Sequence, residues 1–166
     1  MLRLRTETLA VLRDKLRDRG APPTLARPSS GDRDPESVYL IAEYGPLVEL
    51  MFLVMSADGE VSQPEREVLR GALRELDPRV RSTHFGAMLL AAEEALGRQG
   101  PSTRLLDVAR DLRDDPVRAE VAYVLAAAIA FADDRITTDE NSLLNDLAEG
   151  LGIDEAKSEE LMRALL

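Results

Sequence analysis

The chain alternates between stretches in which apolar residues recur every three or four positions and short stretches rich in proline, glycine and polar residues. The three-to-four spacing places apolar side chains on one face of an α-helix. The first such stretch, residues 3–19, is expected to form an amphipathic helix that ends at Gly20. No segment alternates apolar and polar residues with a period of two, the pattern of a half-buried strand. The pattern therefore predicts an all-α fold.

The chain divides at a change of composition near residue 34. Residues 21–34 contain three prolines and little apolar content, which is typical of a linker. We therefore expect residues 1–34 to form an amphipathic helix with a Pro-rich linker, and residues 35–166 to form a helical domain. A chain of 166 residues is long enough to bury a substantial core in one domain.

Caps and helix breakers set the expected helix boundaries. Asp34-Pro35 and Asp115-Pro116 each combine an N-cap residue with a proline suited to the first helical position. Gly45-Pro46 is expected to kink or break the first helix, because proline lacks the backbone N–H and clashes with the preceding turn. Further helices are expected over residues 47–57, 63–76, 80–96, 103–112, 116–132, 138–149 and 155–166. With the parts before and after Gly45-Pro46 counted as one helix, this makes about seven helices in the domain, preceded by an N-terminal helical arm.

Two segments of the domain repeat each other. Residues 55–65 align with residues 130–140, and both contain Ala-Asp, two residues, a β-branched apolar residue, Ser or Thr, two residues and Glu. A self-match at a fixed offset indicates an internally duplicated organisation. Each copy connects two predicted helices and carries an Asp and a Glu.

The two Glu residues, Glu65 and Glu140, have a structural interpretation. Each follows a Ser or Thr by three positions at the start of an apolar helical run, which is the pattern of a capping box. There the hydroxyl accepts from the backbone N–H at the third helical position, and the Glu accepts from the N–H of the cap residue. Such a cap stabilises a helix by about 0.5–2 kcal/mol and needs no ligand.

The two Asp residues, Asp58 and Asp133, are harder to explain in this way. Each follows the C-terminal end of a predicted helix, where the helix dipole presents negative charge and a carboxylate costs about 0.3–1 kcal/mol. A turn could explain one Asp through a side-chain-to-backbone hydrogen bond. The repetition suggests a cation that offsets the penalty. Carboxylate and carbonyl oxygens suit hard cations, and we expect Ca²⁺ ahead of Mg²⁺.

The predicted metal ligands are thus Asp58, Glu65, Asp133 and Glu140, which would converge on one site or form two equivalent sites. The Asp and Glu of each copy span eight positions. This spacing does not match the 12-residue loop of an EF-hand.

Charge is distributed unevenly along the chain. The net charge is −10, yet residues 1–27 contain seven basic and three acidic side chains. The acidic total argues against nucleic acid as the main partner. The basic arm could dock on its own body, on an anionic membrane or on an acidic partner. The chain has no Cys, no apolar run of 18 residues and no signal-peptide pattern near its start, so we expect a cytoplasmic protein.

Catalytic groups are sparse. His84 is the single histidine, and without Cys or a second His it cannot form a usual zinc site or Ser-His arrangement. We expect it to be structural. Glu93 and Glu94 are adjacent on a predicted helix and point apart, which makes them a poor acid–base pair. We therefore expect no enzymatic activity.

The doubled Asp-Gly-x-[Val/Ile]-[Ser/Thr]-x-x-Glu arrangement resembles the tellurite-resistance TerB-like family. The resemblance extends over residues 37–166, and its most specific parts are residues 56–65 and 132–140. It implies an all-helical bundle of two pseudo-symmetric halves with an acidic, divalent-cation-binding surface. It also implies a non-enzymatic module of bacterial stress-response or defence systems that works beside membrane-associated protein partners. Carried over by position, the implied cation residues are Asp58, Glu65, Asp133 and Glu140.

Two functions remain open at this point. The first is a cation-responsive module that presents a surface to a protein partner. The second is a metal-independent scaffold that recognises partners through its acidic face and basic arm. Arg135 favours the second, because it could neutralise the site in the second copy. A homodimer is also compatible with the sequence, since Phe52, Leu53 and Phe85 could face either a core or a second copy.

Overall fold

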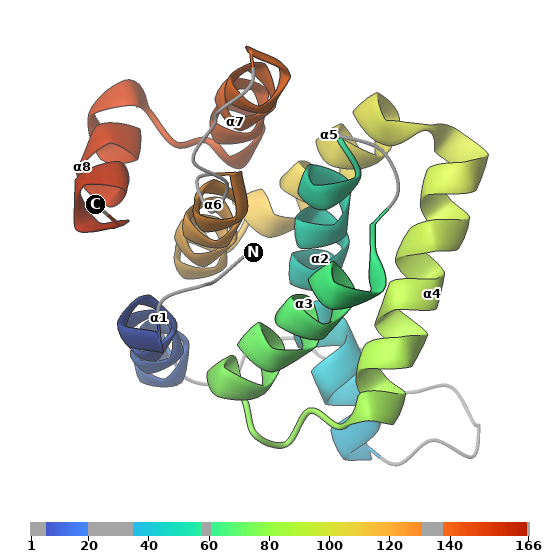
Figure 1. Ribbon diagram of the computed structural model, residues 1–166. Coiled ribbons are helices and arrows are strands. Elements are labelled where there is room, and N and C mark those ends of the chain that lie inside the picture. The colour runs from blue at the N-terminus through green and yellow to red at the C-terminus, as the bar shows by residue number, and fades with distance from the viewer. Residues whose placement is uncertain (1–5, 20–34, 58–60, 131–137, 166) are drawn as a thin grey trace.

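The computed structural model describes residues 6–19, 35–57, 61–130 and 138–165, which form eight α-helices and contain no strand (Figure 1). The helices are α1 (Thr6–Arg19), α2 (Pro35–Ser56), α3 (Gln63–Leu76), α4 (Ser82–Gln99), α5 (Pro101–Arg113), α6 (Pro116–Ala130), α7 (Thr138–Leu151) and α8 (Glu155–Leu165). The predicted all-α fold is confirmed. Within the described residues, α2 to α8 are the seven helices expected after the N-terminal arm.

Helix α2 lies at the centre of the fold, where it packs against α3, α4, α5 and α6 (Figure 1). Its side chains at Leu40, Leu47, Val48 and Leu50 are fully buried. Among the described residues, this is the one helix that is long and apolar enough to cross a membrane. Of its apolar stretch, 61% is buried inside the fold. Apolar residues around the whole helix are the pattern of a core helix.

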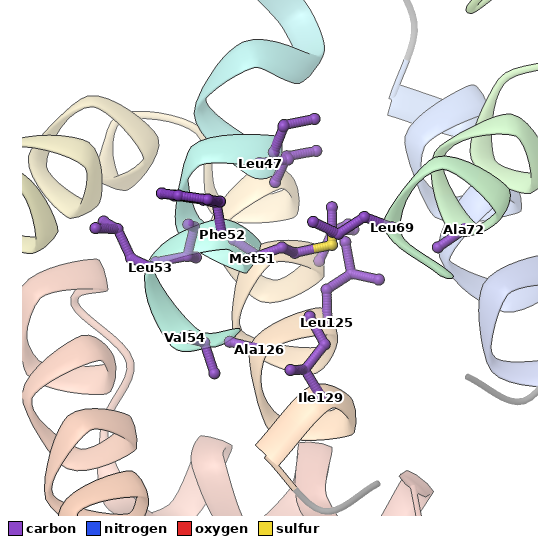
Figure 2. Close-up of a cluster of buried hydrophobic side chains, with 14 of the residues drawn as sticks. Leu47, Met51, Phe52, Leu53, Val54, Leu69, Ala72, Leu125, Ala126 and Ile129 are labelled. Carbon is purple, nitrogen blue, oxygen red and sulfur yellow. The ribbon is translucent and has the colours of Figure 1, made fainter. Parts of the chain in front are cut away.

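Helix α6 is the second core helix, and it packs directly against α2. Its alanines allow close approach, and ten of its 15 residues are buried. Figure 2 shows Met51 and Val54 of α2 in one apolar cluster with Leu125 and Ile129 of α6. Both helices run in the same direction in this view, so their C-terminal ends face the same side of the molecule.

The basic arm docks on its own body, which was one of three alternatives. Leu9, Leu12 and Leu16 of α1 are buried, and the helix packs against α3 and α6. An ion pair at 3.7 Å joins Lys15 of α1 to Glu120 of α6. The apolar face of the arm is therefore used within the chain, and its polar face remains at the surface.

Of the kink or break expected at Gly45-Pro46, the break is wrong, because α2 continues through Pro46 to Ser56. Proline in a helix leaves the carbonyl four residues earlier without its helical donor. Here that carbonyl belongs to Ala42, and the guanidinium of Arg118 in α6 donates to it at 3.4 Å and to the carbonyl of Glu43 at 2.7 Å. A side chain from a distant part of the sequence thus replaces the missing donor.

Two further expectations need correction. A gap was expected over residues 97–102, but α4 runs to Gln99 and α5 begins at Pro101, with only Gly100 between them. Gly100 adopts a φ of 80°, a conformation that glycine tolerates without a steric penalty. The candidate dimer residues Phe52, Leu53 and Phe85 are buried in the core of the chain, so they are not available to a second copy.

Candidate functional site

Three of the four predicted cation ligands fall outside what the structure describes. Asp58 and Asp133 lie in the undescribed segments 58–60 and 131–137. Glu140 is in α7, but only its backbone is described. Glu65, in the first turn of α3, is the one predicted ligand with a described side chain. The described residues hold no group of three or more His, Cys, Asp or Glu side chains arranged for a metal. The four-residue site therefore stays a prediction.

Glu65 forms the capping box that its sequence context predicts. Its Oε2 accepts from the backbone N–H of Ser62 at 2.7 Å and from the Ser62 hydroxyl at 2.9 Å. The Ser62 hydroxyl oxygen accepts in turn from the Glu65 N–H at 3.4 Å. Pro64 occupies the first turn, where its missing N–H is not needed. One carboxylate oxygen of Glu65, Oε2, is thus committed to the helix start, because it accepts both hydrogen bonds from Ser62.

The helix ends that lead to the two Asp residues are described. Helix α2 is followed by Ala57, the residue before Asp58, and α6 ends at Ala130, three residues before Asp133. Because α2 and α6 pack together with their C-terminal ends on the same side (Figure 2), both repeated segments begin at that side. This arrangement brings together the two helix dipole ends at which negative charge is unfavourable.

A groove of about 690 Å³ begins at this end of α2. Its lining, which we call the α5–α7 groove, is Ala57, Pro101, Ser102, Leu105, Leu106, Leu143, Asp146, Glu149 and Gly150. Leu106 is 56% exposed, and the two charged lining residues, Asp146 and Glu149, are both acidic. An apolar floor with an acidic edge suits a partner segment that carries apolar and basic side chains.

A second cavity holds a polar cluster that the sequence analysis missed. The hydroxyl of Tyr44 donates to Asp77 Oδ2 at 2.9 Å, while Arg79 donates to both Asp77 oxygens, from Nε at 3.0 Å and from Nη2 at 2.7 Å. Arg79 also lies over the ring of Tyr39, 5.5 Å from its centroid. Asp77 is only 6% exposed. A fully hydrogen-bonded carboxylate of this kind is stable in a buried position.

The cluster shifts the pKa values of its members in opposite directions. Burial by itself would raise the pKa of Asp77, but the hydrogen bonds from the Arg79 side chain and backbone and from Tyr44 outweigh burial and lower that pKa. Burial, and then the negative charge of Asp77, raise the pKa of Tyr44. The hydrogen bond to Asp77 raises the pKa of Arg79. At neutral pH the cluster is therefore an ionised Asp–Arg pair with a neutral tyrosine.

The signal for this cluster was present in the sequence. Asp77 follows the C-terminal end of α3, which is the same unfavourable position that singled out Asp58 and Asp133. In this case an arginine two residues later offsets the charge, and no cation is needed. Arg135 stands two residues after Asp133 in the second copy. By analogy with Asp77 and Arg79, Arg135 could offset the charge of Asp133 without a cation.

The remaining candidate side chains have structural roles. His84 Nδ1 accepts from the Arg81 backbone N–H at 3.0 Å, and its Nε2 is 2.9 Å from the Ser37 hydroxyl, so the ring ties the start of α4 to α2. Glu93 forms an ion pair at 2.6 Å with Arg66 of α3. Neither forms part of a catalytic arrangement among the described residues.

Comparison with known proteins gives one finding. A family model described as "Tellurite resistance protein TerB" matches residues 46–163, which takes in the C-terminal half of α2, all of α3 to α7 and most of α8. Neither the curated proteins nor the solved structures gave a match. The all-helical fold agrees with this family. The chain belongs to the TerB tellurite-resistance family.

Proposed function

We propose that this chain is a non-enzymatic, cation-responsive interaction module of a bacterial stress-response or defence system, acting in the cytoplasm. Family membership supports the general part of this proposal, namely that the chain is a tellurite-resistance-associated module. The cation would be Ca²⁺ ahead of Mg²⁺, held by Asp58, Glu65, Asp133 and Glu140. The observation that carries the proposal is the position of the α5–α7 groove, which begins at Ala57, the residue before Asp58.

The coupling between cation and groove follows from charge. In this proposal, carboxylates that follow the C-terminal ends of α2 and α6 add negative charge where both helix dipoles are already negative. A bound divalent cation would offset this charge and hold the two repeated segments in one geometry. Ala57 lines the groove, so the geometry of the segment that follows it would set the groove's edge.

The partner in this proposal is a protein segment that presents apolar side chains flanked by Lys or Arg. Leu105, Leu106 and Leu143 would receive the apolar side chains. Asp146 and Glu149 would face the basic ones, and no basic residue lines the groove. Family resemblance suggests that the partner is membrane-associated.

A metal-independent scaffold is the second candidate, and specific observations favour it. Glu65 is used by the capping box, and Asp77 demonstrates that an Asp after a helix end can be neutralised by an arginine. In this version the groove and the basic arm recognise partners without any cation.

A thermal melt of metal-stripped protein separates the two candidates. Protein in EDTA, Mg²⁺ or Ca²⁺ would be compared at about 0.15 M salt, which screens general charge effects. A cation at 100 times its dissociation constant adds about 2.7 kcal/mol to the free energy of unfolding, which raises the melting temperature by several degrees. The proposal expects this rise with Ca²⁺ and its loss in the double variant Asp58→Asn/Asp133→Asn.

The matched control is Asp18→Asn/Asp111→Asn, which removes two negative charges from exposed positions on α1 and α5. It should respond to Ca²⁺ like the unmodified chain. If neither the unmodified chain nor the control responds to Ca²⁺, the scaffold is the better account. An equal loss of response in both double variants would mean that the cation acts on total charge and not at a site.

A further inference from the structure

A cavity of about 460 Å³ lies between the N-terminal arm and the body, away from the repeated segments. We call it the arm cavity. Its polar lining comes from Arg13 and Arg17 of α1, from Tyr39, Glu43 and Tyr44 of α2, and from Asp77 and Arg79 after α3. Leu16 and Leu76 supply an apolar part of the wall. Its size is within the range of small-molecule sites in proteins. Every lining residue from α1 and α2 precedes the family match, which begins at residue 46.

The charges that line the arm cavity do not balance. Asp77 is neutralised by Arg79 through two charged hydrogen bonds. Glu43, only 3% exposed, has the guanidinium of Arg118 beside it, with Nε and Oε2 3.9 Å apart. Three guanidiniums, those of Arg13, Arg17 and Arg79, and two carboxylates, those of Glu43 and Asp77, line the cavity. The lining therefore carries an excess of one positive charge.

Arg13 and Arg17 have unused hydrogen-bonding capacity. Within the described part of the chain, Arg17 forms no ion pair and no hydrogen bond, while Arg13 Nε is buried without a hydrogen-bond partner. Arg13 Nε forms an ion pair at 3.7 Å with the carboxylate of Asp14, on the exposed side of α1. Arg17 is exposed and lines the cavity, so its guanidinium N–H groups are open to an acceptor that enters from the cavity.

We infer that the arm cavity binds a phosphate monoester. Such a group carries a charge between about −1.5 and −2 at neutral pH, opposite in sign to the guanidiniums of Arg13 and Arg17 that α1 contributes to the lining. Arginine presents paired N–H donors in a geometry that fits phosphate oxygens. The rings of Tyr39 and Tyr44 with Leu16 and Leu76 offer an apolar surface to the organic part of the ester. The inference does not depend on the repeated segments or on any cation.

The arm cavity lies between α1 and the body, so a ligand bound in it would contact both. Arg13 and Arg17 belong to α1, whereas the tyrosines and Arg79 belong to the body. A bound phosphate monoester would therefore bridge the arm and the body. Its binding should slow local opening of α1, and this can be measured by amide hydrogen exchange.

Phenyl phosphate is a suitable probe, because it combines the dianion with an apolar ring. Its dissociation constant would be measured by isothermal titration calorimetry at about 0.15 M salt, for the full chain and for Arg17→Gln. Arg17 is exposed and has no described partner, so the variant should fold normally. Arg110→Gln is the control, since Arg110 is exposed on α5 and does not line the cavity. We expect binding to weaken about tenfold or more in Arg17→Gln and to stay unchanged in the control.

Vesicles with phosphatidic acid, compared with vesicles of phosphatidylcholine, distinguish a lipid headgroup from a soluble ester as the source of the phosphate. Binding of either probe that depends on Arg17 and increases the protection of α1 amides supports the site. Absence of binding by the full chain to both probes would overturn the inference. Equal weakening in Arg17→Gln and Arg110→Gln would overturn it as well, because it would reflect total charge alone.

Discussion

The guanidinium of Arg118 in α6 donates to the backbone carbonyl of Glu43 in α2 at 2.7 Å. Glu43 lies one turn before Pro46, the proline inside α2, and Arg118 also reaches the carbonyl of Ala42. The contact joins the two core helices at the position where α2 lacks a backbone donor. It explains how an apolar core helix can contain a proline and continue without a break.

Arg118→Met should destabilise the protein by about 2–4 kcal/mol. The substitution keeps an apolar stem but removes the donors to two carbonyls and leaves the buried Glu43 carboxylate without the adjacent positive charge. Urea unfolding at neutral pH measures the change.

A double-mutant cycle with Pro46→Ala tests the reason for that loss. Alanine restores the N–H that donates to the Ala42 carbonyl, so Arg118→Met should cost at least about 0.5 kcal/mol less in the Pro46→Ala background. Strictly additive effects would contradict the role that we assign to Arg118 at the proline.

The Asp77 cluster should make stability depend on acid pH. Because the folded pKa of Asp77 is lowered from its ordinary value of 3.8, its contribution is present above about pH 4 and is lost as the pH falls through the lowered value. Tyr44→Phe removes one of the groups that lower this pKa, so the contribution should be smaller and its loss should be complete at a higher pH. Asp77→Asn should abolish this part of the pH dependence.

Chemical unfolding between about pH 2 and 6 measures the slope of the free energy of unfolding against pH for each variant. Asp18→Asn, at an exposed position of α1 with no described partner, is the control and should keep the unmodified slope. The same slope in Asp77→Asn as in the unmodified chain would rule out Asp77 as the source of the acid dependence.

Two glycine-to-alanine substitutions should change stability in opposite directions. A Cβ at Gly150 in α7 would lie 2.9 Å from the Cβ of Ala109 in α5, so Gly150→Ala should destabilise by about 1–3 kcal/mol. Nothing lies within 4 Å of a Cβ at Gly71 in α3, so Gly71→Ala should stabilise by about 0.4–1 kcal/mol. Thermal melts of both variants test this, and a gain in stability for Gly150→Ala would contradict the close α5–α7 contact.

Glu65 can be tested for its two roles separately. Glutamine can still form the capping box, so Glu65→Gln should keep helix stability close to that of the unmodified chain, whereas Glu65→Ala should lose about 0.5–2 kcal/mol. If Glu65 also binds a cation, the Gln variant should lose affinity for Ca²⁺ while it keeps its apo stability. A Ca²⁺ response that is unchanged in Glu65→Gln would assign Glu65 to the cap alone.

Local patterns predicted the parts of the fold that depend on nearby residues. The capping box of Ser62 and Glu65 and the start of α6 after Asp115 follow from residues within one helical turn. The amphipathic pattern of the arm predicted helix α1 and its leucine face. In these places the sequence neighbours are also the structural partners.

Contacts between distant residues could not be predicted in the same way. The continuity of α2 depends on Arg118, about 75 positions away, and the burial of Asp77 depends on Tyr44, 33 positions away. Arg79, by contrast, is two residues from Asp77 and could have been recognised as its partner. By the same argument, an ion pair between Asp133 and Arg135 is the main alternative to the predicted cation site.

Equilibrium dialysis of metal-stripped protein against Ca²⁺, at about 0.15 M salt, tests the central claim most directly. The account predicts saturable binding of one or two ions per chain, lost in Asp58→Asn/Asp133→Asn and retained in Asp18→Asn/Asp111→Asn. Absence of saturable binding, or binding that persists unchanged in the Asp58→Asn/Asp133→Asn variant, would contradict it.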